Sequence, residues 1–218
     1  GETVFREVDQ PFSGLHRTRR TGARTFDVWS LRKKKYQIGE TVALSMNNCR
    51  ETAGAFFSES SDLAVAQVTV NYLHGFGWLT QMCRDVSFTG VHFHPDPQHH
   101  VSSFADCIHV CGCKGTVTIK DCSFTQAHDD AINIHGVFLR FVRRVDDHTA
   151  VFQFVHRQQG GYRAFFPGDT VRFYYRSSLQ PCGEENIVAA AEDDIDAKTC
   201  TLTFDRPLPE DIGAKFRG

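Results

Sequence analysis

Short runs in which apolar and polar residues alternate dominate the chain, and they predict β-strands. Three of them resemble one another: DLAVAQVTV at 62–70, DVSFTGVHF at 85–93 and GTVTIKDCSF at 115–124. Alternation with a period of two places one face of each strand in a core and the other in solvent. Gly, Asp and Asn interrupt the runs, and long helical patterns with capping residues are hard to find. The pattern therefore predicts an all-β fold.

These runs recur at a nearly constant interval, which indicates a repeat. The first two are offset by 23 residues (85 − 62 = 23). A second pair of strand-like runs, FADCIHV at 104–110 and HDDAINI at 128–134, is offset by 24 residues (128 − 104 = 24). A repeat of this length that holds two or three short strands fits one turn of a parallel β-helix. The insertion HPDPQHHVS at 94–102 lengthens the interval between the second run, at 85–93, and the third, at 115–124.

The repeat also predicts which residues stack. In a parallel β-helix, equivalent residues of successive coils lie about 4.8 Å apart. We therefore expect apolar ladders in which Ile108 lies over Ile132, Val110 lies over Ile134, and Val70 lies near the phenylalanines at 93 and 124. A stack of three coils exposes unpaired strand edges at both ends, so it needs caps, and its exposed ends offer a surface for a homodimer.

The segments on either side of the coils have a different pattern. YQIGETVALSM at 36–46 and FFPGDTVRFYY at 165–175 share Gly-acid-Thr-Val before an alternating strand, which is common in small antiparallel barrels. We therefore expect a partial β-barrel-like module at 1–50, parallel coils at 51–144 and a second β-barrel-like module at 145–218.

Composition narrows the classes of partner. The 218 residues are 41% hydrophobic, enough for a sizeable core, and the net charge is −2. This charge provides no general attraction for nucleic acid or for a membrane surface. No apolar run approaches the roughly 20 residues of a transmembrane helix, so we expect no membrane span. The first residues do not form a signal peptide, so a leader was either removed or never present.

Eight cysteines are present, but their spacing does not match a small disulfide framework. Cys111 and Cys113 are separated by one residue, whereas a zinc knuckle has two between its cysteines. We expect the cysteines to be small buried hydrophobic side chains, with one disulfide bridge at most. We expect no metal site.

The alignment of the coils also stacks aspartates. Asp106 falls on Asp130 (130 − 106 = 24), each in an Asp-x-Ile pattern, and Asp129 lies beside Asp130. Clustered like charges are costly, so such a cluster usually has a function. Strict alternation raises an objection, because it would turn Asp130 inward together with Ile132. Asp129 and Asp130 reach one site only if the chain bends near Asp130.

Three carboxylates suit the hydrolysis of a glycosidic bond with inversion. One carboxylic acid protonates the leaving oxygen, and another carboxylate or a pair activates a water on the opposite face of the sugar. Asp106 and Asp130 would hold that water as a shared base, and Asp129 would be the acid. Two alternatives remain open: turn residues without a catalytic role, and a calcium site completed by Asn133.

Around these residues the sequence resembles a known family. SSFADCIHVCGCKGTVTIKDCSFTQAHDDAINIHG (102–136) resembles the core of the α-1,3-galactosidases of glycoside hydrolase family 110, and the likeness extends through RETAGAFFSESSDLAVAQVTVNYLHGFGWLTQMC (50–83). These bacterial enzymes remove terminal α-1,3-linked galactose, including that of blood-group B glycans. The likeness is good over about 36–140. The polygalacturonases of family 28 are more distantly similar, with an aspartate one coil before an Asp-Asp pair.

The resemblance implies a right-handed parallel β-helix with inserted β-barrels, an inverting exo-hydrolase without a cofactor, and a galactose-containing glycan as partner. It also implies that the catalytic residues are Asp106, Asp129 and Asp130. It also implies the central portion of a longer enzyme that is secreted, periplasmic or on the cell surface. The alternatives are a non-catalytic carbohydrate-binding or structural β-helix fragment and a polygalacturonase-like hydrolase.

Further polar and aromatic side chains near the aspartates are candidates for contacts with sugar. His109 and Asn133 stack in the alignment, on the face opposite the isoleucines, and Trp78 offers an aromatic ring for the apolar face of galactose. The full set of predicted substrate-binding residues is Arg50, Glu51, His74, Trp78, Gln81, His109, Asn133 and His135.

Overall fold

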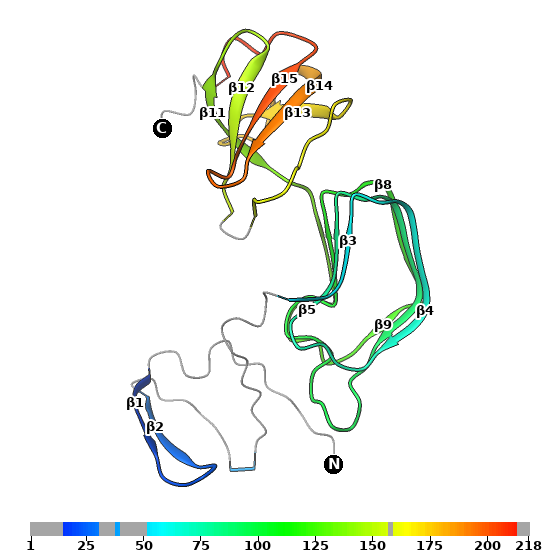
Figure 1. Cartoon of the computed structure of the whole chain (residues 1–218), viewed down its shortest axis with the longest axis vertical. Helices are drawn as coiled ribbons and strands as arrows, with labels where there is room; N and C mark the ends of the chain where they lie inside the picture. Colours follow the sequence, from blue (N-terminus) through cyan, green and yellow to red (C-terminus); the bar gives the residue numbers. More distant parts are fainter. Residues whose placement is uncertain (1–14, 31–37, 40–51, 157–158, 213–218) are drawn as a thin grey trace. The chain divides into compact units, whose positions relative to one another are not determined.

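Figure 1 shows the computed structural model of the chain. The structure describes residues 15–30, 38–39, 52–156 and 159–212. Every regular element in these ranges is a β-strand, so the all-β prediction is confirmed. Within the same ranges no helix is long and apolar enough to cross a membrane. The chain forms two compact units, which divide between Ile134 and His135.

Two strands near the start of the described residues form a hairpin. β1 (Leu15–Arg20) pairs antiparallel with β2 (Phe26–Ser30). Arg19 donates to the Asp27 carboxylate at 2.9 Å across the hairpin. Most of the module predicted at 1–50 lies outside the described residues, so a barrel in this part of the chain stays a prediction.

Residues 53–135 form two parallel sheets, and the chain passes from one sheet to the other in turn (Figure 1). The first sheet has the order β10-β7-β5-β3, in which the strands are β3 (Ala53–Ser58), β5 (Phe76–Gln81), β7 (Ile108–Cys111) and β10 (Ile132–His135). The second contains β4 (Ser61–Val70), β6 (Arg84–Phe93), β8 (Lys114–Lys120) and the short β9 (Ser123–Phe124), which also pairs with β6.

The register of these strands confirms the stacking predicted from the repeat. Leu63 of β4 pairs with Val86 of β6, an offset of 23 residues (86 − 63 = 23). Val70 pairs with Phe93, and Phe93 pairs with Phe124. The sequence repeat is therefore a repeat of strand pairing, in which each coil adds one strand to each sheet.

Backbone bends recur at equivalent positions of successive coils. Asp62, Asp85 and Gly115 all have positive φ, at 53°, 52° and 71°, just after the start of strands β4, β6 and β8. Asp85 Oδ1 accepts a hydrogen bond from Thr116 N of the next coil at 2.9 Å. Asp tolerates this left-handed conformation better than most residues, which explains an acidic residue at the head of these strand-like runs.

Strands β7 and β10 continue the same register. Ile108 N donates to Ala131 O at 3.2 Å, as Trp78 N donates to Cys107 O at 2.8 Å one strand earlier. Because Trp78 pairs with Ile108, the same pattern aligns Ile108 with Ile132. His135 closes β10, so the division between the two units falls at the last residue of a strand that belongs to the first sheet.

Apolar side chains from both parallel sheets meet in one core. Trp78 and Ile108 come from the first sheet, and Phe88 and Phe93 come from the second. The rings of Trp78 and Phe93 meet edge to face, with centroids 5.3 Å apart. Burying each such side chain contributes about 1.5–3 kcal/mol. None of the seven cysteines within the described residues forms a disulfide bond, and five of them are buried.

The apolar ladder ends at β10. Ile132 continues the inward column of Ile108 and Ile134 continues that of Val110, but their exposed fractions are 40% and 54%. Among the described strands β10 has one neighbour, β7. The predicted homodimer through exposed coil ends stays a prediction.

The second unit contains a five-stranded antiparallel sheet in the order β11-β12-β15-β14-β13. Its strands are β11 (Leu139–Arg144), β12 (Thr149–Phe154), β13 (Thr170–Tyr174), β14 (Pro181–Asp194) and β15 (Thr199–Phe204). The coils are expected from the sequence as far as residue 144, whereas this unit begins at His135. The difference arises because β11 pairs with β12 and not with β10.

Candidate active site

Asp129 and Asp130 lie in a bend and not in a strand. β10 begins only at Ile132, and the chain bends over 128–131. Asp106 holds the same position before β7, two residues ahead of its first residue. Strict alternation applies only within a strand, so the bend removes the argument that Asp130 must point into the core.

The three predicted carboxylates converge. One carboxylate oxygen from each of Asp106, Asp129 and Asp130 lies within 4.8 Å of the other two. Asp106 is 3% exposed, whereas Asp129 and Asp130 are exposed. The cluster therefore has a buried side and a side that a solvent-borne molecule can reach. Like charges at about 4 Å repel each other by about 1 kcal/mol in water and by more near a protein surface.

Each stacked aspartate has a hydrogen-bond donor three residues further along its own coil. His109 Nδ1 donates to Asp106 Oδ2 at 2.6 Å. Asn133 Nδ2 donates to Asp130 Oδ2 at 3.3 Å. These equivalent contacts orient the two carboxylates and offset part of their repulsion.

His109 is the cation of the site. Burial disfavours its positive charge, but the hydrogen bonds with Asp106 and Cys111 outweigh burial and raise the pKa of His109 from 6.5 to about 9. The side chains of His109 and Asp106 are 15% and 5% exposed. At neutral pH the imidazolium therefore lies against the Asp106 carboxylate, where it favours the ionised form that a base needs.

We expect the free energy of unfolding to fall as the pH rises from 6.5 through 9. The pKa of folded His109 lies above its unfolded value of 6.5, so its protonation stabilises the fold fully below pH 6.5, and this contribution is lost as the pH passes about 9. The loss is up to about 3 kcal/mol, because one pKa unit corresponds to about 1.4 kcal/mol. Urea unfolding at a series of pH values measures it.

The variant His109→Gln is the control for this pH dependence. Glutamine keeps a hydrogen-bond donor but does not titrate. The fall in unfolding free energy over this pH range should therefore largely disappear. The same fall in the variant as in the parent chain would contradict the assignment to His109.

Other predicted residues lie along the same sheet or beside it. Gln81 ends β5, and its register partner is Cys111 at the end of β7. The register that aligns Ile108 with Ile132 also brings Cys111 level with His135, so these three residues form one column. His74 is exposed, in the bend before β5.

Cys111 is a neighbour of His109 and His135 that was not predicted from the sequence. Its sulfur, a ring nitrogen of His109 and a ring nitrogen of His135 all lie within 4.8 Å of one another. The signal was present, since residues 109 and 111 share a strand face. The cysteine spacing was compared only with a zinc knuckle, which takes no ligand from a neighbouring coil.

Trp78 was wrong as a sugar-stacking residue. It is 6% exposed and packs in the core against Phe93. The reason is its register with Ile108, which places it on the inward face of β5. Arg50 and Glu51 lie outside the described residues.

Comparison with known proteins identifies relatives of the chain. Alpha-1,3-galactosidase B of Bacteroides fragilis (strain YCH46) is 34% identical over 145 residues, which cover 65% of this chain and 24% of that protein. Alpha-1,3-galactosidase A of Streptomyces avermitilis is 34% identical over 172 residues, 75% of this chain and 28% of that protein. The chain is a homologue of the alpha-1,3-galactosidases.

Two further comparisons agree with this conclusion. Alpha-1,3-galactosidase A of Akkermansia muciniphila is 30% identical over 168 residues, 76% of this chain and 28% of that protein. Residues 149–215, which contain β12 to β15, match the family described as GLAA-B beta-barrel domain II, so these four strands belong to a β-barrel domain. The resemblance to alpha-1,3-galactosidases is thus confirmed, and the chain spans about a quarter of the length of these curated relatives.

Proposed function

We propose that the chain carries the active site of an inverting exo-acting glycoside hydrolase that removes terminal α-1,3-linked galactose from glycans. The observation that carries this proposal is the convergence of Asp106, Asp129 and Asp130, whose carboxylate oxygens lie within 4.8 Å of one another. Homology to proteins named alpha-1,3-galactosidase supports the choice of sugar and linkage. The repeating parallel strand pairs support a right-handed β-helix as the scaffold, and a secreted, periplasmic or cell-surface location, which the family resemblance implies, is part of the proposal.

In the proposed mechanism Asp106 and Asp130 hold the attacking water between them. A hydrogen bond to a carboxylate spans about 2.7 Å, so one water can bridge two oxygens that lie within 4.8 Å of each other. The water oxygen bonds to the anomeric carbon, and a proton of the water passes to this pair. The bond from the anomeric carbon to the bridging oxygen breaks, and that oxygen takes the proton of Asp129. Galactose leaves as its β anomer.

Asp129 must turn away from the pair when the sugar binds. The acid and the base of inverting enzymes stand roughly 6.5–9.5 Å apart. The oxygens of this cluster lie closer, within 4.8 Å. Asp129 is exposed and lies in a bend, so its side chain has room to turn outward. Asp106 is buried and held by His109, which favours its assignment to the base.

Product stereochemistry tests the proposed function. The protein that contains this chain is incubated with Galα1-3Gal, and the first galactose released is followed by proton NMR before mutarotation. We expect β-galactose first. Galβ1-3Gal is the control, and it should remain uncleaved. Release of α-galactose first would overturn inversion, and binding of Galα1-3Gal without any release would favour the non-catalytic alternative. Cleavage of polygalacturonate would favour the polygalacturonase-like one.

A further inference from the structure

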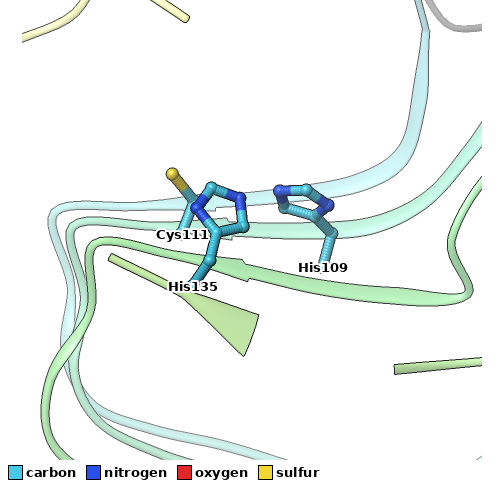
Figure 2. Close-up of side chains that lie close together, drawn as sticks. All are labelled: His109, Cys111 and His135. Carbon is cyan, nitrogen blue, oxygen red and sulfur yellow. The ribbon is translucent and has the colours of Figure 1, made fainter. Parts of the chain in front are cut away.

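The outer face of the first sheet carries a second cluster, formed by His109, Cys111 and His135. Figure 2 shows the three side chains projecting from the same side of the strands. Cys111 ends β7 and His135 ends β10, level with each other in the register. Each residue places one nitrogen or sulfur within 4.8 Å of the other two.

We propose that His109, Cys111 and His135 form a site for a transition-metal ion of the zinc type. One thiolate and two imidazoles are ligands that Zn²⁺ accepts, whereas Ca²⁺ and Mg²⁺ take oxygen ligands. Zn–N and Zn–S bonds of about 2.0–2.3 Å place tetrahedral ligands roughly 3.5 Å apart. The present separations, all within 4.8 Å, therefore need only small side-chain rotations.

The second partners of the two imidazoles are those that support metal binding. His109 Nδ1 donates to the Asp106 carboxylate at 2.6 Å. His135 Nδ1 donates to the carbonyl oxygen of Gly136 at 2.8 Å. A carboxylate or a carbonyl on one ring nitrogen fixes the tautomer and presents the other nitrogen, Nε2, to a metal. On binding, His109 would release its Nε2 proton and Cys111 its thiol proton to solvent, and the hydrogen bond between them would give way to two bonds to the ion.

Burial sets the direction from which an ion can enter. Cys111 is 3% exposed, and His109 and His135 are half-buried. The Cys111 sulfur is therefore the least accessible of the three ligand atoms, and an ion would reach it past the two imidazoles. Three protein ligands leave the fourth position of a tetrahedral ion for water or another exogenous ligand.

A bound ion would join two successive coils. Its ligands come from β7 and from β10, the end strand of the first sheet, whose one neighbour among the described strands is β7. The ion would fasten β10 to the sheet and hold His109 against Asp106. The bound ion would therefore first of all stabilise the fold. A test of metal binding or of stability can thus fail while the hydrolase proposal holds, and the reverse is also possible.

Cobalt spectroscopy tests the site directly. The chain is titrated with Co²⁺, whose bond to a thiolate produces a charge-transfer absorption in the near ultraviolet. We expect this band to saturate at one ion per chain and to vanish when Zn²⁺ is added. In Cys111→Ser the band should be absent. Isothermal titration should show that His135→Gln weakens Zn²⁺ binding by at least about 10-fold, since even outer-shell partners of metal ligands are worth about 10- to 100-fold.

Two control variants separate this cluster from its neighbours. Cys113→Ser removes a thiol two residues away that packs against the core, and Asp129→Asn removes one acidic group of the carboxylate cluster. Both should bind Co²⁺ like the parent chain. In the parent chain, Zn²⁺ at 100 times its Kd should raise the melting temperature by about 5–10 °C.

Three results would overturn the proposal. They are the absence of the charge-transfer band in the parent chain, a band that survives in Cys111→Ser, and an affinity that falls in Asp129→Asn but not in His135→Gln. Because His135 is half-buried at a strand end, His135→Gln keeps the test decisive if Cys111→Ser does not fold.

Discussion

Replacing Asp129 by Asn is expected to slow galactose release by roughly 100- to 10,000-fold, the usual contribution of a general acid. Asparagine has nearly the same shape but carries no proton that it can give to the leaving oxygen. Asp129 is exposed, so we expect the substitution to leave the fold intact. The measurement is kcat on Galα1-3Gal, together with the affinity for galactose, which should change little.

Matched substitutions show whether the loss is specific to the cluster. Asp121→Asn alters an exposed aspartate with φ of 52°, a conformation that Asn also adopts readily, and kcat should be unchanged. Asp106→Asn should lower kcat by a similar factor to Asp129→Asn, since it removes half of the proposed base. Full activity in Asp129→Asn, or an equal loss in Asp121→Asn, would refute the assigned role.

Replacing Gly77 by Ala is expected to destabilise the first unit by about 3 kcal/mol or more. A Cβ at Gly77 would lie under 3.0 Å from the backbone carbonyl oxygens of Asp106 and Cys107, closer than real Cβ atoms come. Gly77 N also donates to Asp106 O at 2.9 Å. The added methyl group must therefore push β5 away from the bend that carries Asp106, and galactose release should fall as well.

Chemical unfolding and the melting temperature measure this effect. The melting temperature should drop by roughly 6–12 °C, given about 2–4 °C per kcal/mol for a chain of this size. Gly136→Ala is the control, because its Cβ would have a side-chain carbon of Phe138 at 3.8 Å as its nearest neighbour. Equal stability of the two variants would contradict this prediction, because it would show that β5 and the bend at Asp106 leave room for a methyl group at residue 77.

The strand pairing could be predicted because the pattern of apolar and polar side chains recurs along the chain with the period of the coils. The offsets of 23 and 24 residues reappear as pairs such as Leu63 with Val86. The bend at 128–131 could not be predicted from alternation, since an Asp can head a strand or occupy a turn. It is set by the preceding coil, where Cys107 N donates to Asp130 O at 2.9 Å. That bond joins residues that are distant in the sequence.

The orientation of single side chains was harder to predict than the aspartate cluster. Trp78 and Gln81 belong to the same strand, yet the first is in the core and the second forms a column with Cys111. The sequence copy that contains them is separated from the next by the insertion at 94–102, so the face of each residue depends on a register that length alone leaves open. The register of the aspartates is not ambiguous in this way, because no insertion lies between 106 and 130.

The position of β10 at the end of the ladder makes the two halves of the carboxylate cluster unequal. Asp106 precedes β7, which lies between β5 and β10, whereas Asp129 and Asp130 precede β10, which has one neighbour among the strands that the structure describes. Local opening costs least where contacts are fewest. In the proposed mechanism the acid Asp129 and one member of the water-holding pair, Asp130, thus lie where local opening costs less, while Asp106, the other member of the pair, is anchored. Any segment that covers Ile132 and Ile134 would, by rigidifying β10, act on catalysis without touching the substrate.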